Sequence, residues 1–242
     1  MKIDVITKPR LSHDLMALRV VREFRSGMVV NLGIGLPTLV SDHVPTNGAV
    51  MMHSENGMIG YGPFPSDDKE GNPNIVNAGG QMVTLIPGAS FVHHADSFAI
   101  IRGGHIDVAV LGALQVSEKG DLAKYLMPGR ALGSPGGAVD LAAQARRVIV
   151  LMEHATRDGQ PKIVRDCTLP LTGRACVSLV ITDVGVFEVD GESVWLCEIA
   201  PGWTVDEIQS ITDVPLLTSL DLKEMHFDLE EFVPVDKVYT DA

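Results

Sequence analysis

One loop of this chain places a carboxylate among residues that let a ligand come close to it. The loop reads SENGMIGYGP from Ser54 to Pro63, and it follows an apolar segment of strand type at Ala49 to His53. Glu55 is its acidic side chain, and Asn56 and Gly57 come next. A carboxylate that is partly shielded from water can serve an acyl transfer as a nucleophile or as a general base. It can equally cap neighbouring backbone amides, and spacing alone slightly favours that structural role.

Glycine-rich turns follow other apparent strands, at Gly33 to Pro37, Gly103 to His105 and Gly133 to Asp140. Because open parallel sheets bind ligands at the carboxyl ends of their strands, these turns are candidate ligand loops. Each turn taken singly is also typical of an ordinary connection between a strand and a helix. The first turn lacks the third glycine of a dinucleotide fingerprint, and no Gly-Lys-Ser or Gly-Lys-Thr occurs in the chain. The sequence therefore argues against a Rossmann NAD site and contains no Walker phosphate loop.

Two pairs of titratable residues have weaker functional interpretations. Glu153 and His154 resemble an acid-base pair at a strand end, but they are equally suited to bracing loops or a subunit contact. His93 and His94 have no metal-site pattern around them, so a non-metal role is favoured and no metal site is predicted.

Several other polar residues have roles that the sequence does not rank. Three scattered cysteines are too few for a disulfide framework or a zinc site, namely Cys167, Cys176 and Cys197. Cys167 and Cys176 suit small core positions rather than nucleophiles. Three residues are candidates for the lining of a substrate cleft, namely Arg102, His105 and Gln115.

A sheet must position these loops, and the hydrophobic pattern predicts one. Short apolar strands alternate with helical segments, which favours an α/β fold with a mainly parallel open sheet flanked by helices. Helices are predicted at 14–25, 38–43, 138–147 and 204–212, the last with Thr204 and Glu207 in capping-box register. Strands are predicted at 28–32, 49–53, 98–101, 108–111, 148–152, 177–182, 186–189 and 194–199, the last two as a hairpin around Asp190-Gly191.

Length and composition limit the class of protein. No linker or fixed-period repeat divides the chain, so we expect one domain over residues 1–242, with an acidic tail at 222–242 that lies on the surface or is mobile. The formal net charge of -12 argues against binding of nucleic acid, because phosphate contacts need Lys and Arg. No apolar run reaches the length of a membrane span and the first residues do not form a secretory signal, so a cytoplasmic location is expected.

The glutamate loop resembles the corresponding motif in B subunits of family I CoA-transferases of the 3-oxoacid type. The resemblance rests on Ser54 to Gly57 and Gly60 to Pro63, and it continues in order from about residue 11 to about residue 212. The other matching segments are Gly33–Thr38, Gly103–Asp107, Leu111–Ser117, Gly120–Ala123, Met152–His154, Cys167–Gly173 and Ile181–Asp183. The resemblance implies the fold that this family shares with ribose-phosphate isomerases.

The resemblance also implies a mechanism and a partner. The catalytic glutamate of the family matches Glu55, and the glycine whose amide binds the thioester oxygen matches Gly136. Asn56, Gly57 and Gly137 are then expected at the substrate and CoA site, with Asn56 holding the loop. A ping-pong reaction would pass through a glutamyl anhydride and a glutamyl-CoA thioester. No cofactor is implied, because coenzyme A is a substrate, and a separate A subunit would complete a hetero-oligomer, since this chain has the length of one half.

The identity of the substrates stays open. The resemblance implies transfer of CoA from an acyl-CoA such as succinyl-CoA to a carboxylic acid, with acetoacetate as the first expectation and 3-oxoadipate as the second. Family members usually read Lys-Gly-Met-Gly-Gly-Ala-Met-Asp where this chain reads Gly133-Ser134-Pro135-Gly136-Gly137-Ala138-Val139-Asp140. The lost lysine bears on acyl specificity. The alternatives are a CoA-thioester hydrolase on the same fold and a non-catalytic domain that binds a sugar phosphate or effector.

Overall fold

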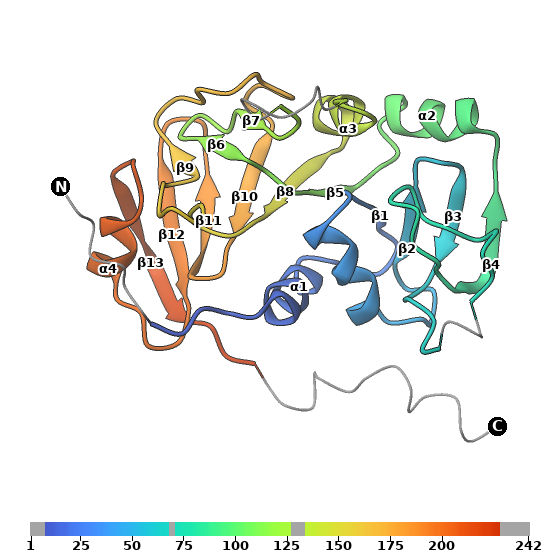
Figure 1. Ribbon diagram of the computed structural model, residues 1–242, viewed down its shortest axis with the longest axis horizontal. Coiled ribbons are helices and arrows are strands. Elements are labelled where there is room, and N and C mark those ends of the chain that lie inside the picture. Colours follow the sequence, from blue (N-terminus) through green and yellow to red (C-terminus); the bar gives the residue numbers. More distant parts are fainter. Residues whose placement is uncertain (1–7, 68–70, 127–133, 228–242) are drawn as a thin grey trace.

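A mixed sheet organises the chain, whose computed structural model describes residues 8–67, 71–126 and 134–227 (Figure 1). Within these ranges the sheet has ten strands. In spatial order they are β13 (Leu216–Glu224), β12 (Val194–Ile199), β11 (Gly185–Val189), β10 (Val177–Ile181), β8 (Arg147–Leu151), β5 (Val108–Leu111), β1 (Val29–Leu32), β2 (Met51–Ser54), β3 (Met58–Tyr61) and β4 (Leu85–Phe91).

The centre of the sheet is parallel. Strands β10, β8, β5, β1 and β2 pair in parallel in that order, and antiparallel hairpins flank them on both sides. Their side chains are almost all buried because helices cover both faces, as is typical of parallel sheets. The loops after these strands therefore lie along one edge of the sheet. The predicted α/β fold with a mainly parallel open sheet is confirmed.

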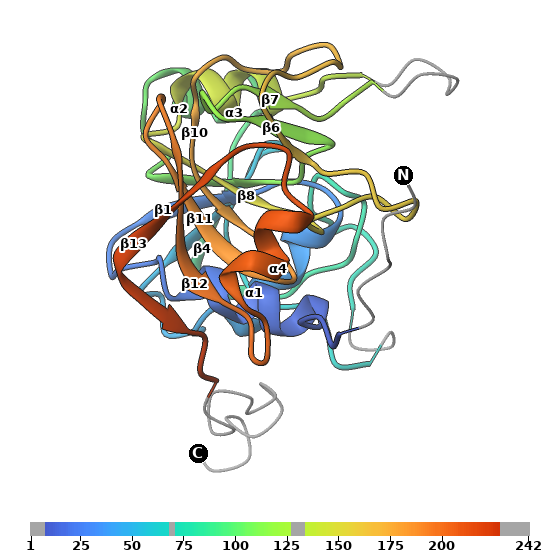
Figure 2. The same ribbon diagram turned by 90° about the vertical axis from the view of Figure 1, so that its left-hand side faces the viewer.

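Helices cover the two faces of this sheet (Figure 1, Figure 2). The helix α1 (His13–Val21) packs on the 3-10 helix η1 (Leu36–His43) at one face, and α2 (His94–Arg102) packs on α3 (Ala138–Gln144) at the other. The Ser12 side chain caps α1 by accepting from the amide of Leu15. The short α4 (Val205–Ser210) begins with the predicted capping box between Thr204 and Glu207. None of the helices within the described ranges is long and apolar enough to cross a membrane.

Most predicted elements are present, but the strand predicted at 98–101 is wrong. These residues form the second half of α2, which starts at His94 and carries the N-cap His93. The helical prediction at 138–147 is too long, since α3 ends at Gln144 and Arg147 begins β8. The hairpin around Asp190-Gly191 is confirmed by the antiparallel pairing of β11 with β12.

A second, smaller sheet lies beside the edge where the parallel strands end. It contains β7 (Leu122–Ala123), β6 (Gln115–Ser117) and β9 (Ile163–Val164), in that order. Its backbone pairing fixes the segment that leaves β7 toward residue 126. The expected tail begins inside β13, and Met225 is buried in the core, whereas residues 228–242 lie outside the described part.

Candidate active site

A cavity of about 690 Å³ opens at the carboxyl edge of β1, β2 and β5. Five segments contribute to its lining: the loop after β1, the loop after β2, the first half of α2, the residues after β7, and the start of α3 with the loop before it. The lining residues on which the chemistry depends are Glu55, Asn56, Lys124, Ser134, Gly136 and Gly137. Segments far apart in the sequence thus meet around one carboxylate.

Glu55 is partly buried at the end of β2, and its carboxylate faces this cavity. The fully buried Asn31 of β1 donates a hydrogen bond from Nδ2 to Oε2 of Glu55, at 3.2 Å. The negative charge of Glu55 changes the pKa values of two neighbouring residues. Burial raises the pKa of Tyr61, and the charge of Glu55 raises it further. Burial lowers the pKa of Lys124, and the charge of Glu55 partly offsets this effect. The hydrogen bond from Asn31 therefore orients the carboxylate, which remains accessible to a ligand from the cavity.

A chain of buried polar groups supports Asn31. Its Nδ2 also lies 3.0 Å from Nδ1 of His53, which accepts because the NH2 group of the Asn31 side chain can only donate. The Nε2 proton of His53 then donates to Oγ of Ser97 in α2, at 3.0 Å. Burial lowers the pKa of His53 to about 4, so the ring is neutral at pH 7, as this pattern requires. These hydrogen bonds connect the ends of β1 and β2 to α2 next to Glu55.

Gly137 brings the backbone beside the glutamate. A Cβ atom added to Gly137 would lie 3.2 Å from the Phe98 ring and 3.4 Å from Cγ of Glu55, so the absence of a side chain lets this loop approach the carboxylate. Gly136 has a φ of +52°, and its amide donates to Oγ of Ser134 at 3.2 Å. The amide expected to bind an oxyanion thus has a partner in the ligand-free chain, which a substrate oxygen would have to replace. Gly133 of the same loop lies outside the described residues.

Asn56 and Gly57 differ in their relation to the cavity. Asn56 lines it, and its Nδ2 donates to the carbonyl oxygen of Val76 at 2.8 Å, which ties the loop to residues 75–83. Gly57 is buried, does not line the cavity, and packs against the backbone of Val92. Gly57 therefore allows the close turn after Glu55 and does not itself contact the cavity.

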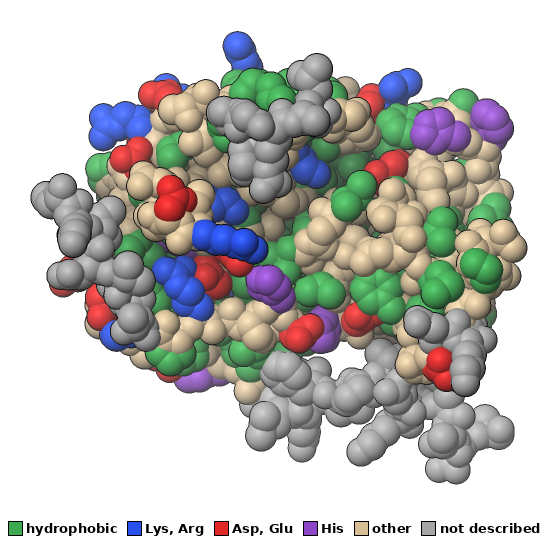
Figure 3. All heavy atoms as spheres, viewed as in Figure 1, with side chains coloured by type: hydrophobic (Ala, Val, Ile, Leu, Met, Phe, Trp, Pro, Cys, Tyr) green, Lys and Arg blue, Asp and Glu red, His purple; other side chains and the backbone are tan. Residues whose placement is uncertain are grey.

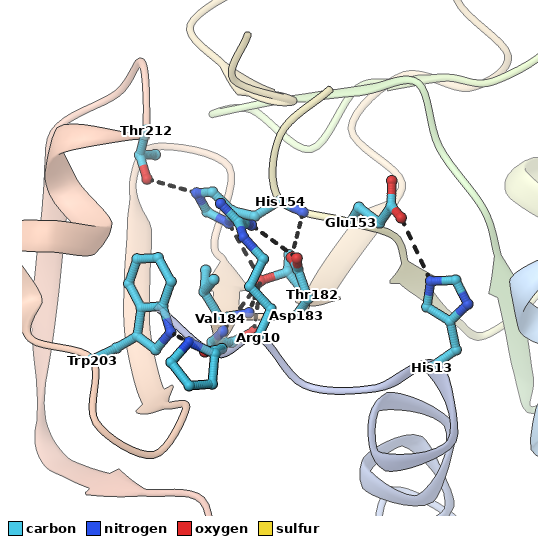
Figure 4. A network of polar contacts seen from close by, with 11 residues as sticks. Arg10, His13, Glu153, His154, Thr182, Asp183, Val184, Trp203 and Thr212 are labelled. Carbon is cyan, nitrogen blue, oxygen red and sulfur yellow. Dashed lines mark hydrogen bonds and ion pairs between the residues drawn. The ribbon is translucent and has the colours of Figure 1, made fainter. Parts of the chain in front are cut away.

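The pair Glu153 and His154 lies in a different part of the same edge, after β8 (Figure 4). The His154 ring is fully buried between Thr182 and Thr212, and its Nε2 lies 2.9 Å from Oγ1 of Thr212. Burial lowers the pKa of His154 to about 4. The Glu153 side chain turns away from it and lies 3.5 Å from Nε2 of His13. The two do not form an acid-base pair, and His154 braces the loops instead.

The same brace holds the first described residues of the chain. Arg10 forms an ion pair with Asp183 at 2.8 Å, and Asp183 accepts from the backbone amide of His154. The indole of Trp203 donates to the carbonyl oxygen of Pro9 at 2.8 Å. These contacts fix the segment that leads into α1.

The three residues proposed for the cleft lining do not line this cavity. Arg102 is exposed and forms an ion pair with Asp140 at 2.7 Å, His105 is exposed, and Gln115 binds the Thr168 segment. His93 caps α2, whereas the His94 ring lies against Phe98 in the cavity wall, with ring centroids 4.7 Å apart and the planes tilted by 53°. The thiols of Cys167 and Cys176 are partly buried, and burial raises the pKa of each to about 11, which makes them poor nucleophiles.

Two residues of the site were not predicted. Asn31 is a polar residue inside the apolar segment Val29–Leu32, and this exception to the pattern is a usable signal. No sequence feature marks Lys124 as a site residue, because the strand before it has only two residues and cannot be recognised from the hydrophobic pattern.

The buried histidines predict a loss of stability in mild acid. His53 and His154 have native pKa values near 4 and an unfolded value near 6.5. The unfolded state therefore binds more protons between these values, and stability is retained above pH 6.5 and lost as pH falls toward 4. Between pH 7 and pH 5 we expect the free energy of unfolding to fall by about 2 kcal/mol for each histidine.

Urea unfolding at both pH values measures this loss, and His154→Gln should remove about half of it. An unfolding free energy that is equal at the two pH values would contradict the burial of neutral histidines.

The surface outside the cavity carries charges of both signs. Acidic and basic side chains are interspersed on the face shown in Figure 3, although the whole chain has a formal net charge of -12. No group of His, Cys, Asp and Glu residues suited to a metal ion occurs in the described part.

Comparison with known proteins gives a consistent set of relatives. A family model described as Coenzyme A transferase matches residues 14–210. The chain is 49% identical to the B subunit of 3-oxoadipate CoA-transferase from Pseudomonas putida, over 88% of this chain and 99% of that protein. It is 48% identical to the mitochondrial succinyl-CoA:3-ketoacid coenzyme A transferase 2A of Rattus norvegicus, over 86% of this chain and 40% of that protein.

Solved structures share the fold. An acyl-CoA transferase from Escherichia coli O157:H7 superposes with a TM-score of 0.71 at 21% identity, over 96% of this chain and 46% of that chain. The chain thus spans less than half the length of the rat and Escherichia coli proteins, and nearly all of the Pseudomonas protein.

Proposed function

Because the chain belongs to the coenzyme A transferase family, we propose that it is the glutamate-bearing half of a CoA-transferase and that Glu55 is its nucleophile. One observation carries the proposal: Glu55 is held by Asn31 at the wall of a cavity of about 690 Å³, with one side of its carboxylate open. A nucleophile needs this combination of a fixed direction and an accessible oxygen.

The proposed reaction exchanges bonds without a net change in protons. A carboxylate oxygen of Glu55 attacks the carbonyl carbon of the donor thioester, the carbon-sulfur bond breaks, and CoA leaves as a thiolate. The thiolate attacks the glutamyl carbonyl of the resulting anhydride and releases the donor acid. The acceptor acid then displaces CoA from Glu55, and CoA in turn takes the acyl group of the new anhydride. Glu55 is regenerated as a carboxylate.

Two features of the site support this chemistry. Asn31 fixes the attacking carboxylate, which is a weak nucleophile and gains most from positioning. The Gly136 amide can stabilise the oxyanion once it exchanges Ser134 for the substrate oxygen, and one such donor contributes roughly 3 kcal/mol. A partner A subunit would supply the remainder of the site, since the Pseudomonas relative, which this chain covers over 99% of its length, is named as a B subunit.

The acceptor that we propose is a 3-oxoacid, with acetoacetate first and 3-oxoadipate second, and the donor is succinyl-CoA. The names of the relatives support this class, because they refer to 3-ketoacids and to 3-oxoadipate.

Transfer and hydrolysis are distinguished by what happens without an acceptor. We expect the chain co-expressed with an A subunit to form acetoacetyl-CoA or 3-oxoadipyl-CoA from succinyl-CoA, and to release almost no free thiol when the acceptor acid is omitted. Liquid chromatography of the CoA esters and a thiol assay measure both. Free CoA produced at the same rate without an acceptor would identify a hydrolase, and full turnover by the isolated chain would exclude a site shared with a partner.

A further inference from the structure

Lys124 provides a positive charge to the cavity that contains Glu55. It follows β7 and lines the cavity, and its backbone amide donates to Oγ1 of Thr172 at 3.2 Å, which fixes its position. Among the described lining residues it is the one lysine or arginine. This cation comes from the segment after β7 and not from the glycine-rich loop before α3.

The ammonium of Lys124 has no hydrogen-bond or ion-pair partner among the described residues. The contrast with Arg19 is informative, because that buried guanidinium binds the carboxylates of Glu23 and Glu198 at 2.7 and 2.8 Å. A partly buried cation without a partner is costly, and the cost is recovered when a ligand supplies an anion.

The position of Lys124 relative to Glu55 limits which part of a substrate it can bind. Burial lowers the pKa of Lys124 and the nearby charge of Glu55 raises it, yet the two side chains form no ion pair. A group that reacts with Glu55 must touch the Glu55 carboxylate, whereas Lys124 lines the same cavity without pairing with that carboxylate. A substrate with a second anionic group, a few bonds away from the reacting carbon, could therefore contact both residues in this cavity of about 690 Å³.

We propose that Lys124 is a specificity-determining residue whose ammonium binds the non-reacting carboxylate of a short dicarboxylic acyl group while the other carboxyl group reacts at Glu55. This inference rests on the proposed function of Glu55. An acyl group with one carboxyl and an apolar end has no anion for Lys124, so it gains nothing from this contact and the cavity favours the dicarboxylic group. A lysine suits this task because it presents a point charge on an adaptable stem.

Isotope exchange with a single acid tests the proposal, because it isolates one acyl group at a time. The assembled enzyme is incubated with succinyl-CoA and labelled succinate, or with acetoacetyl-CoA and labelled acetoacetate. Lys124→Met should lower kcat/KM for succinate exchange about 100-fold, mainly through KM, and should change acetoacetate exchange less than about threefold. Lys124→Arg, which keeps the charge, should recover part of the succinate exchange.

The controls separate this inference from the function on which it rests. An unchanged unfolding temperature of Lys124→Met shows that the variant is folded. Equal losses for both acids, or no loss for succinate, would overturn the role of Lys124 in specificity. Absence of any exchange by the wild-type enzyme would instead overturn the proposed transferase function.

Discussion

Glu55→Gln in the assembled enzyme is expected to lower kcat by at least about 10⁴-fold, because the amide is the same size as the carboxylate but is not a nucleophile. The neutral side chain can still accept the hydrogen bond from Asn31 Nδ2, so the loop should keep its shape. A steady-state assay of CoA transfer measures the loss. Glu153→Gln is the matched control, since Glu153 also follows a parallel strand but pairs with His13. Its turnover should stay near that of the wild type.

A covalent intermediate distinguishes a nucleophile from a general base. Acyl-CoA without acceptor should leave CoA attached to Glu55 through a thioester that survives denaturation, and borohydride should reduce that thioester to an alcohol and inactivate the enzyme. Mass spectrometry of the Glu55 peptide detects both products, and Glu55→Gln should yield neither. If activity persists in Glu55→Gln, or if the label is found on Cys167 alone, another group carries the acyl transfer.

Gly57→Ala should produce the largest loss of stability of any single methyl group added near the site. A Cβ atom at Gly57 would overlap the carbonyl oxygen of Val92, and the φ of +114° is one that alanine rarely adopts. Because the obstacle is backbone, it can be relieved only by moving β3 away from the start of α2. We expect the free energy of unfolding to fall by about 3 kcal/mol or more, measured by urea denaturation.

The control for this variant is Gly88→Ala in β4. Gly88 also has a positive φ, of +91°, but an added Cβ would meet no atom within 4 Å. It should lose only about 1 kcal/mol, the cost of the backbone conformation alone. Equal losses in the two variants would mean that the close approach to Val92 does not limit the turn at Glu55.

The sequence was most informative where a local signal and the tertiary structure agree. The capping box at Thr204, the hairpin at Asp190 and the buried strand at 108–111 each have a pattern that needs no distant partner, and each is present. The segment 98–101 shows the opposite case. A short run of Phe, Ala and Ile is compatible with a strand or with one face of a helix, and the packing of α2 on α3 decides for the helix.

The active site could be predicted only in part, for a similar reason. Glu55 stands in a motif whose residues are neighbours in the chain. Asn31, which binds Glu55, comes from β1, and Lys124, which lines the same cavity, comes from the segment after β7. Whether these residues lie near Glu55 depends on the order of the strands in the sheet. Glycine spacing indicated that the loop at Gly136 and Gly137 is special, but not that the amide of Gly136 is occupied by Ser134.

The position of β1 between β2 and β5 has a consequence for how the chain acquires activity. Val30 pairs with Met52 on one side and with Val108 on the other, so the second pairing must wait until a long stretch of chain has been synthesised and brought back. Parallel pairing over such separations is slow, because the entropy of loop closure is lost before the contacts form. Lys124 and Gly137 follow β5 in the sequence and join the cavity around Glu55 only after this step. A nascent chain that already displays Glu55 therefore still lacks the other walls of the described cavity, which are assembled only when the sheet is complete.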